Sequence, residues 1–119
     1  MSREQKEEAV RRYVQCLNDK DVSVIEKLYA PDAVVEDPVG SEPVVGIRAI
    51  VEFYQKSGFP PLRKAELTGP VRCAKNAAAF PFRVTFEGEG GRGIQTLDII
   101  DTFEFDETSR VISMKAYWG

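Results

Sequence analysis

The sequence predicts a single α+β domain over residues 1–119, with three N-terminal helices packed on a curved, mostly antiparallel sheet. Two patterns carry this prediction. Apolar residues recur at helical spacing through the first half of the chain, whereas the second half alternates apolar and polar residues between short turns. Helices followed by strands, rather than alternating with them, favour a layer of helices on one face of an antiparallel sheet. A length of 119 residues also suits one domain.

The first helix is expected to run from about residue 2 to residue 18. Ser2, with Gln5 at the third residue after it, forms a possible capping box, in which each side chain bonds the backbone N–H of the other residue. The apolar stripe of this helix consists of Ala9, Val10, Tyr13, Val14 and Leu17. Tyr13 therefore points inward, where a tyrosine is usually a packing residue whose hydroxyl finds one partner.

Two shorter helices are expected next. Asp21 can cap the second helix and Pro31 ends it. Its inner positions are Val22, Ile25, Leu28 and Tyr29. After a turn in GSEPVVG, the third helix covers roughly residues 47–57, and Gly58 suits the position just after its end. Its inner positions are Ile47, Ile50, Val51 and Tyr54.

Residues 33–39, AVVEDPV, are expected to form a strand in which an aspartate interrupts an apolar row. The alternation puts Ala33, Val35, Asp37 and Val39 on one face. Glu36 falls on the other face and is interpreted as a solvated neighbour. Pro38 limits pairing to a sheet edge or a strand end. Asp37 is therefore either a turn aspartate beside proline, which is a common arrangement, or a carboxylate on the apolar side.

The second half of the chain is expected to be β structure. The predicted strands cover about residues 63–68, 70–74, 77–87, 94–106 and 110–118. The segment EGEGGRG is a glycine-rich hairpin loop and not a phosphate cradle, because a strand rather than a helix follows it. Pro81 lies inside a predicted strand, so that strand must be an edge or bulged there.

Two of these strands have strongly one-sided apolar faces. The first face consists of Phe80, Phe82, Val84 and Phe86. The second consists of Ile112, Met114, Ala116 and Trp118. Such faces are usually plain core, but they would also suit the lining of a pocket for a flat hydrocarbon.

Asp101 is the middle member of an apolar row in the strand at 94–106. The row consists of Leu97, Ile99, Phe103 and Phe105 together with this aspartate. A carboxylate there must be paired, be protonated, or lie where the alternation breaks. One interpretation is a β-bulge or sheet edge that turns Asp101 to solvent. The other is a carboxylic acid kept neutral in an apolar site so that it can donate a hydrogen bond.

The composition excludes several classes of function. A net charge of −3 without a basic run argues against nucleic acid and anionic membranes as partners. The apolar runs fall short of the roughly 18 residues of a membrane span, and the charged N-terminus is unlike a signal peptide, so a cytoplasmic protein is expected. The chain has no histidine, and its two cysteines, Cys16 and Cys73, form no CxxC motif. This argues against His/Cys metal sites and against Ser-His-Asp or Cys-His catalysis.

One inward tyrosine and two inward aspartates, set among aromatic residues without histidine, resemble the bacterial Δ5-3-ketosteroid isomerases. The resemblance extends over nearly the whole chain, from RRYV to MKAYW. Its most specific part is VEDPVGSEP at residues 35–43, supported by RYV at 12–14 and IDTF at 100–103. It implies a nuclear-transport-factor-like conical fold that encloses an apolar pocket. It also implies a homodimer that needs no cofactor or metal.

Carried over residue by residue, the resemblance implies that Asp37 is a general base and that Tyr13 and Asp101 are the two donors of an oxyanion hole. It implies a steroid pocket lined by Tyr29, Phe53, Tyr54, Phe82, Phe86, Met114 and Trp118. Tyr29 and Tyr54 fall where some members have tyrosines hydrogen-bonded to the catalytic one. The implied reaction converts a 3-oxo-Δ5 steroid to its conjugated Δ4 isomer. Its acid pH limb is expected in the ordinary range of an aspartate, since Asp37 lies at a strand end.

Two alternatives stay open beside this reading. The first is another enzyme of the same fold, such as a dehydratase or a cyclase acting on a polycyclic ketone, although such enzymes commonly use histidine. The second is a non-enzymatic module that binds a small molecule. Loss of Asp37 or Asp101 would have favoured this second alternative, and both residues are present. The sequence therefore favours the isomerase.

Overall fold

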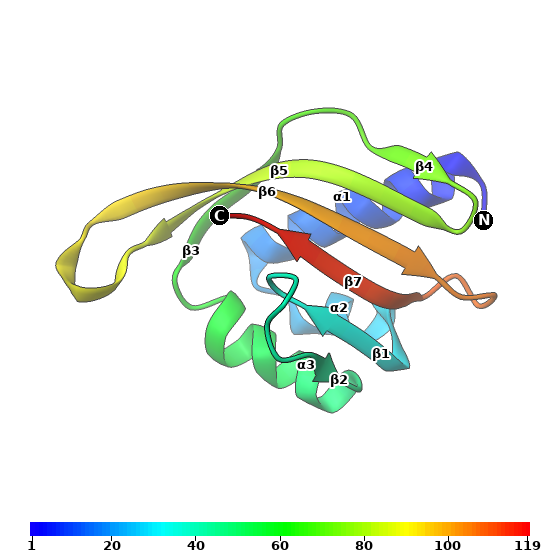
Figure 1. The fold of residues 1–119 in the computed structure, drawn as a ribbon, viewed down its shortest axis with the longest axis horizontal. Coiled ribbons are helices and arrows are strands. Elements are labelled where there is room, and N and C mark those ends of the chain that lie inside the picture. The colour runs from blue at the N-terminus through cyan, green and yellow to red at the C-terminus, as the bar shows by residue number, and fades with distance from the viewer.

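The computed structural model describes residues 1–119 and places three helices against a seven-stranded sheet that does not close into a barrel (Figure 1). The helices are α1 (Arg3–Asp19), α2 (Val22–Leu28) and α3 (Ile47–Phe53). The strands are β1 (Tyr29–Glu36), β2 (Val44–Val45), β3 (Leu62–Leu67), β4 (Arg72–Ala74), β5 (Ala77–Glu87), β6 (Ile94–Phe105) and β7 (Val111–Tyr117). The predicted α+β class is confirmed. None of the helices is long and apolar enough to cross a lipid bilayer.

The sheet is mixed, but antiparallel pairs dominate it. Its strand order is β2-β1-β7-β6-β5-β3, and β4 pairs with the other part of β5. Only the β1–β7 pair is parallel. The β5–β6 hairpin, yellow at its tip in Figure 1, extends beyond the helices as a long ribbon. All five strands predicted in the second half of the chain are present within two residues of their expected ends.

Helix α1 begins with the predicted capping box and packs its apolar stripe against the sheet. The Gln5 backbone N–H donates to Ser2 Oγ at 3.1 Å, and the Ser2 N–H donates to Gln5 Oε1 at 2.7 Å. At the other end, the Asn18 amide donates to the backbone oxygen of Ala65 and accepts from its N–H, both at 2.8 Å. These contacts fix α1 across β3, with Tyr13 buried between the helix and the sheet.

The second helix is shorter than predicted. It ends at Leu28, and Tyr29 begins β1 by pairing in parallel with Val111. The register then shifts before Val34, so Pro31 lies in an irregular stretch of β1 where its missing N–H interrupts no ladder. The prediction that Pro31 would end a helix was wrong because proline also fits a bulged edge of a strand.

Three other local predictions need correction. The strand β1 stops at Glu36, so Val39 does not continue the buried face and is 43% exposed. The segment read as a plain turn contains β2, which pairs with Val34 and Val35 of β1. The third helix is regular only to Phe53 and continues as a wider π-helical turn, Tyr54–Gly58, closed by a 2.7 Å bond from the Phe59 N–H to the Tyr54 oxygen.

Pro81 lies in the middle of β5, opposite Ile100 of β6. On its other side, β3 pairs only from Phe82 onward and β4 only up to Ala79. The Thr68 N–H donates to the Pro81 oxygen at 3.1 Å, so the missing N–H of Pro81 faces the gap between these two strands. The predicted local edge is confirmed.

The outward face of the sheet exposes two large apolar side chains from adjacent strands. Ile100 and Tyr117 are register partners in β6 and β7 and are 50% and 47% exposed. The homodimer implied by the resemblance stays a prediction. Light scattering coupled to size-exclusion chromatography is expected to give twice the 13.3 kDa mass of one chain, and a mass of one chain would contradict it.

Candidate active site

A cavity of about 420 Å³ lies between α1, the end of α3 with its π-helical turn, and the inner face of the sheet. Most of its lining is apolar, and the polar side chains come from only a few positions. The lining residues are Tyr13, Leu17, Asp37, Phe53, Tyr54, Ser57, Gly58, Pro61, Leu62, Phe82, Val84, Phe86, Leu97, Ile99, Asp101, Ala116 and Trp118. Such a pocket, apolar with a few convergent polar groups, is the usual form of a small-molecule site.

The three residues predicted to carry chemistry meet in this cavity. Tyr13 comes from the inner face of α1, Asp37 follows directly after the end of β1, and Asp101 lies within β6. The ladder is regular at Asp101, which pairs with Phe80 on one side and Ala116 on the other. The alternation therefore does not break there, and Asp101 is directed into the apolar side and not to solvent.

Asp101 is buried without a full set of partners. The residue is 1% exposed, and its Oδ1 atom has no hydrogen-bond partner. Burial of the carboxyl raises the pKa of Asp101 well above its ordinary value, and the nearby charge of Asp37 raises it further. The raised pKa favours the neutral carboxylic acid, whose proton can be donated to a ligand in the cavity.

Asp37 is half-buried and has one donor that favours its ionised form. The indole Nε1–H of Trp118 donates to Asp37 Oδ1 at 2.8 Å. Burial raises the pKa of Asp37 above its ordinary value, and the Trp118 hydrogen bond partly offsets that rise. The two carboxyl groups thus differ: Asp37 retains access to water and a donor, whereas Asp101 has neither.

Three buried tyrosines form a hydrogen-bonded chain that ends at the cavity. The Tyr54 hydroxyl lies 2.9 Å from the hydroxyl of Tyr13 and 2.9 Å from that of Tyr29. Burial raises the pKa of each phenol well above its ordinary value, so all three stay protonated. When Tyr13 donates into the cavity, Tyr54 must donate to Tyr13 and Tyr29 to Tyr54, because each hydroxyl has one proton.

Five of the seven predicted pocket residues line the cavity, and two do not. The five are Phe53, Tyr54, Phe82, Phe86 and Trp118. Tyr29 is fully buried behind Tyr54 and reaches the cavity only through their hydrogen bond. Met114 is 1% exposed and packs in the core, since Ala116 rather than Met114 is the β7 residue opposite Asp101. The structure therefore places neither Tyr29 nor Met114 in the lining of this cavity.

The lining also contains residues that the sequence analysis did not assign to a pocket. Leu97 and Ile99 lie on the same alternating row as Asp101, and Val84 lies on the same row as Phe82. Their positions on these rows could have indicated that they line the cavity. Pro61 and Leu62 had no such signal, because they lie where the chain leaves the π-helical turn and enters β3. Phe86 pairs with Leu62 of β3, which extends the apolar wall.

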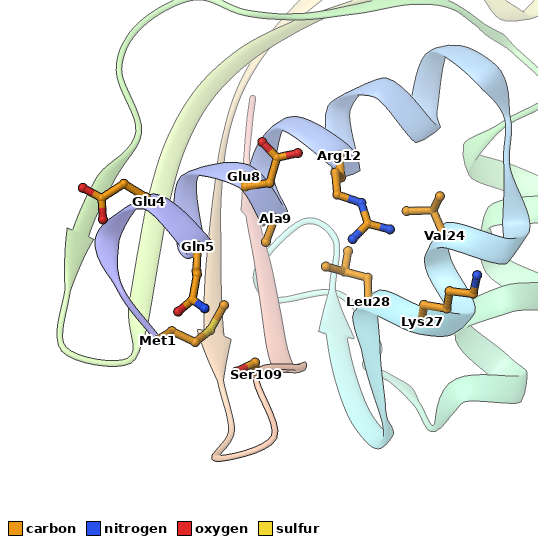
Figure 2. Close-up of a pocket in the computed structure, with 10 residues that line it drawn as sticks. All are labelled: Met1, Glu4, Gln5, Glu8, Ala9, Arg12, Val24, Lys27, Leu28 and Ser109. Carbon is orange, nitrogen blue, oxygen red and sulfur yellow. The ribbon is translucent and has the colours of Figure 1, made fainter.

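A second depression of about 410 Å³ lies on the outer side of α1 and α2 (Figure 2). Its lining includes four charged side chains, Glu4, Glu8, Arg12 and Lys27, all exposed to water. It contains no buried acid and no buried polar atom without a partner. Its charges are therefore solvated, and the chemistry is assigned to the inner cavity.

Comparisons with known proteins show the family to which this chain belongs. The family model described as a SnoaL-like domain matches residues 10–114, which include all three predicted catalytic positions. A steroid Δ-isomerase of Nocardioides simplex is 39% identical over 111 residues, covering 93% of this chain and 87% of that protein. The chain therefore belongs to the SnoaL-like domain family, and it is a ketosteroid-isomerase-like member of it.

Proposed function

We propose that this protein is an isomerase that converts 3-oxo-Δ5 steroids to conjugated 3-oxo-Δ4 steroids. The observation that carries the proposal is the buried Asp101 carboxyl, whose Oδ1 lacks a partner inside an apolar cavity. Tyr13 and the half-buried Asp37 line the same cavity, which supplies a second donor and a base. The similarity to a steroid Δ-isomerase supports the same assignment.

The first step moves a proton from the substrate to Asp37. The C4 proton of a β,γ-unsaturated ketone is acidic because the electron pair of the breaking C–H bond delocalises into the C3 carbonyl. The ionised Asp37 carboxylate takes this proton, and a dienolate forms with its negative charge on O3. Trp118 holds one oxygen of the carboxylate, which leaves the other free to meet the substrate.

The second step returns the same proton to C6. A C6–H bond forms, the C3 carbonyl is restored, and the double bond moves from C5–C6 to C4–C5. Asp37 is regenerated as a carboxylate, so one residue serves both transfers and no oxidant, reductant or cofactor enters the balance. The apolar walls bind the hydrocarbon and keep water away from the exchanged proton.

The oxyanion hole acts between these two steps. Charge accumulates on O3, and the Tyr13 hydroxyl and the neutral Asp101 carboxyl donate hydrogen bonds to it. Because both donors are held in place before the reaction and lie in a water-poor site, they stabilise the dienolate more than they would in water. Tyr54 and Tyr29 strengthen Tyr13 as a donor by donating in turn along the chain.

An ultraviolet assay tests the proposed activity. The purified protein is expected to convert 5-androstene-3,17-dione to the conjugated enone, which is followed by the growth of the enone absorbance. Absence of this change, with the protein folded and the substrate in excess, would refute the proposal. A dehydratase would instead lower the mass of its substrate by one water, which mass spectrometry detects, and a cyclase would change the ring count, which NMR spectroscopy detects.

The pH profile of kcat/KM is expected to show an acid limb set by Asp37. The base works only when ionised, so activity falls as the pH drops through its pKa. Burial raises that pKa, so the limb is expected at a higher pH than for an exposed aspartate, which titrates near about 3.9. An acid limb at or below the pH at which an exposed aspartate titrates would contradict burial as the dominant effect on the pKa of Asp37.

The Trp118→Phe variant is expected to move the same acid limb to still higher pH. Phenylalanine keeps an aromatic wall but cannot donate to Asp37, so the variant loses the hydrogen bond that favours the ionised form. Rates measured between pH 4 and pH 9 in wild type and variant give the shift directly. Tyr117→Phe removes a hydroxyl from the adjacent residue on the outer face and is expected to leave the limb unchanged.

A further inference from the structure

The segment that holds Asp37 has no regular structure on its C-terminal side. Strand β1 ends at Glu36, and the chain then turns through residues 37–43 before β2 begins. Trp118 holds the Asp37 side chain, whereas the Asp37 backbone is held by the last strand residue before it and by the bonds that close the loop after it. A carboxylate that must meet two different carbon atoms of one substrate needs a fixed position, since small misplacements are expensive in rate.

Backbone bonds anchor this loop at two further points. The Val39 N–H donates to the oxygen of Ala116 at 2.9 Å, and Ala116 is the β7 residue that pairs with Asp101. The Ser41 N–H and Oγ both donate to the Pro38 oxygen, at 3.0 and 2.7 Å. These contacts tie the loop to β7 and to itself, but neither links it back to the end of β1.

Glu36 makes that remaining link. Its Oε1 accepts a hydrogen bond from the Gly40 N–H at 3.0 Å, which closes a loop that contains Asp37. Gly40 has a φ of +97°, and no atom lies near the position of an added Cβ. The turn therefore depends on the positive φ of Gly40 and on the hydrogen bond that Glu36 Oε1 accepts. Glu36 itself is paired with Lys115 of β7, so its backbone is fixed in the sheet.

We infer that Glu36 is a positioning residue that holds Asp37 in the cavity by closing the loop after β1. Glu36 does not line the cavity and so does not touch substrate. This role rests on the proposed function, because Asp37 is the proposed base. The same role replaces the interpretation of Glu36 as a solvated neighbour. In this role the Glu36 side chain accepts a hydrogen bond, and its negative charge is not required.

The test compares two changes at Glu36. Glu36→Ala removes the acceptor and is expected to lower kcat on the order of 10-fold with little change in KM. Glu36→Gln keeps an oxygen that accepts from Gly40 and is expected to stay close to wild type. Glu42→Ala is the matched control, because Glu42 lies in the same loop, is exposed and makes no hydrogen bond to it.

A second measurement reads the position of Asp37 without activity. The chain has one tryptophan, so a single indole N–H signal in a proton–nitrogen NMR spectrum reports its bond to Asp37. Glu36→Ala is expected to shift or broaden this signal, whereas Glu36→Gln and Glu42→Ala leave it in place. Gly40→Ala opposes the φ of +97° and is expected to resemble Glu36→Ala in both measurements.

The outcomes of these measurements separate the positioning role of Glu36 from the proposed isomerase function. Wild-type kcat and an unmoved indole signal in Glu36→Ala would overturn the positioning role. Equal damage from Glu36→Gln and Glu36→Ala would also overturn it, since the charge and not the acceptor would then matter. A wild-type protein without isomerase activity would refute the proposed function alone, and the indole signal would still decide whether Glu36 holds Asp37.

Discussion

Asp37→Asn is expected to lower kcat by at least the roughly 10²–10⁴-fold that general-base catalysis contributes. The amide cannot accept a proton from C4, but its oxygen can still accept from the Trp118 indole at the position now 2.8 Å away. The fold and the affinity for steroid are therefore expected to change little. Steady-state rates on 5-androstene-3,17-dione, together with inhibitor binding, measure the two effects separately.

The Glu36→Gln variant is the control for Asp37→Asn, because Glu36 is the neighbouring carboxylate. Glu36→Gln removes the same charge one residue away and is expected to retain nearly all activity. Near-normal turnover in Asp37→Asn combined with a large loss in Glu36→Gln would move the base to Glu36. Since Glu36 does not line the cavity, the structure supports the opposite result.

Replacements of Asp101 are expected to show that its proton matters and its charge does not. Asp101→Ala removes the donor and is expected to lower kcat on the order of 10²–10³-fold, as when a donor of an oxyanion hole is deleted. Asp101→Asn keeps a donor at a similar position and is expected to retain much of the activity. The two variants are compared in the same ultraviolet assay across the pH plateau.

A phenolic inhibitor gives an independent measurement of the same donor. The oxygen of equilenin mimics the dienolate O3, so its affinity is expected to fall more for Asp101→Ala than for Asp101→Asn. Adding Tyr13→Phe is expected to lower it again, because the second donor is then lost. Equal affinity across wild type, Asn and Ala would contradict a neutral donor at position 101.

The loss of activity in Asp101→Ala is not expected to come from unfolding. The carboxyl is buried and one of its oxygens has no partner, so the folded state bears a desolvation penalty there. Removing the group is expected to leave Tm unchanged or raise it, which thermal denaturation followed by circular dichroism measures. A residue that lowers stability and raises activity is typical of a functional site.

Local patterns were sufficient for most of the fold. The capping box of Ser2 and Gln5, the inward face of Tyr13 and the alternating row around Asp101 are set by spacings of a few residues. Such spacings depend only on helix and strand geometry, which every chain shares. Two of the places where they failed are Tyr29, which begins a strand instead of ending a helix, and Met114, which pairs with Phe103 and not with Asp101; local periodicity encodes neither fact.

The sequence by itself determined that an acid interrupts an apolar row at Asp101, that another follows a strand at Asp37, and that no histidine can serve as base. Only the tertiary structure determined the surroundings of these two carboxyl groups, and with them the direction in which each pKa is shifted. Trp118 is 81 residues away from Asp37 in the chain, yet its indole is the donor that favours the charged form of that carboxyl. The burial that raises the pKa of Asp101 comes from α1, β5 and β7 together. A pKa depends on the charges, donors and water around a group in space, and these are set by contacts between distant segments, which no local pattern contains.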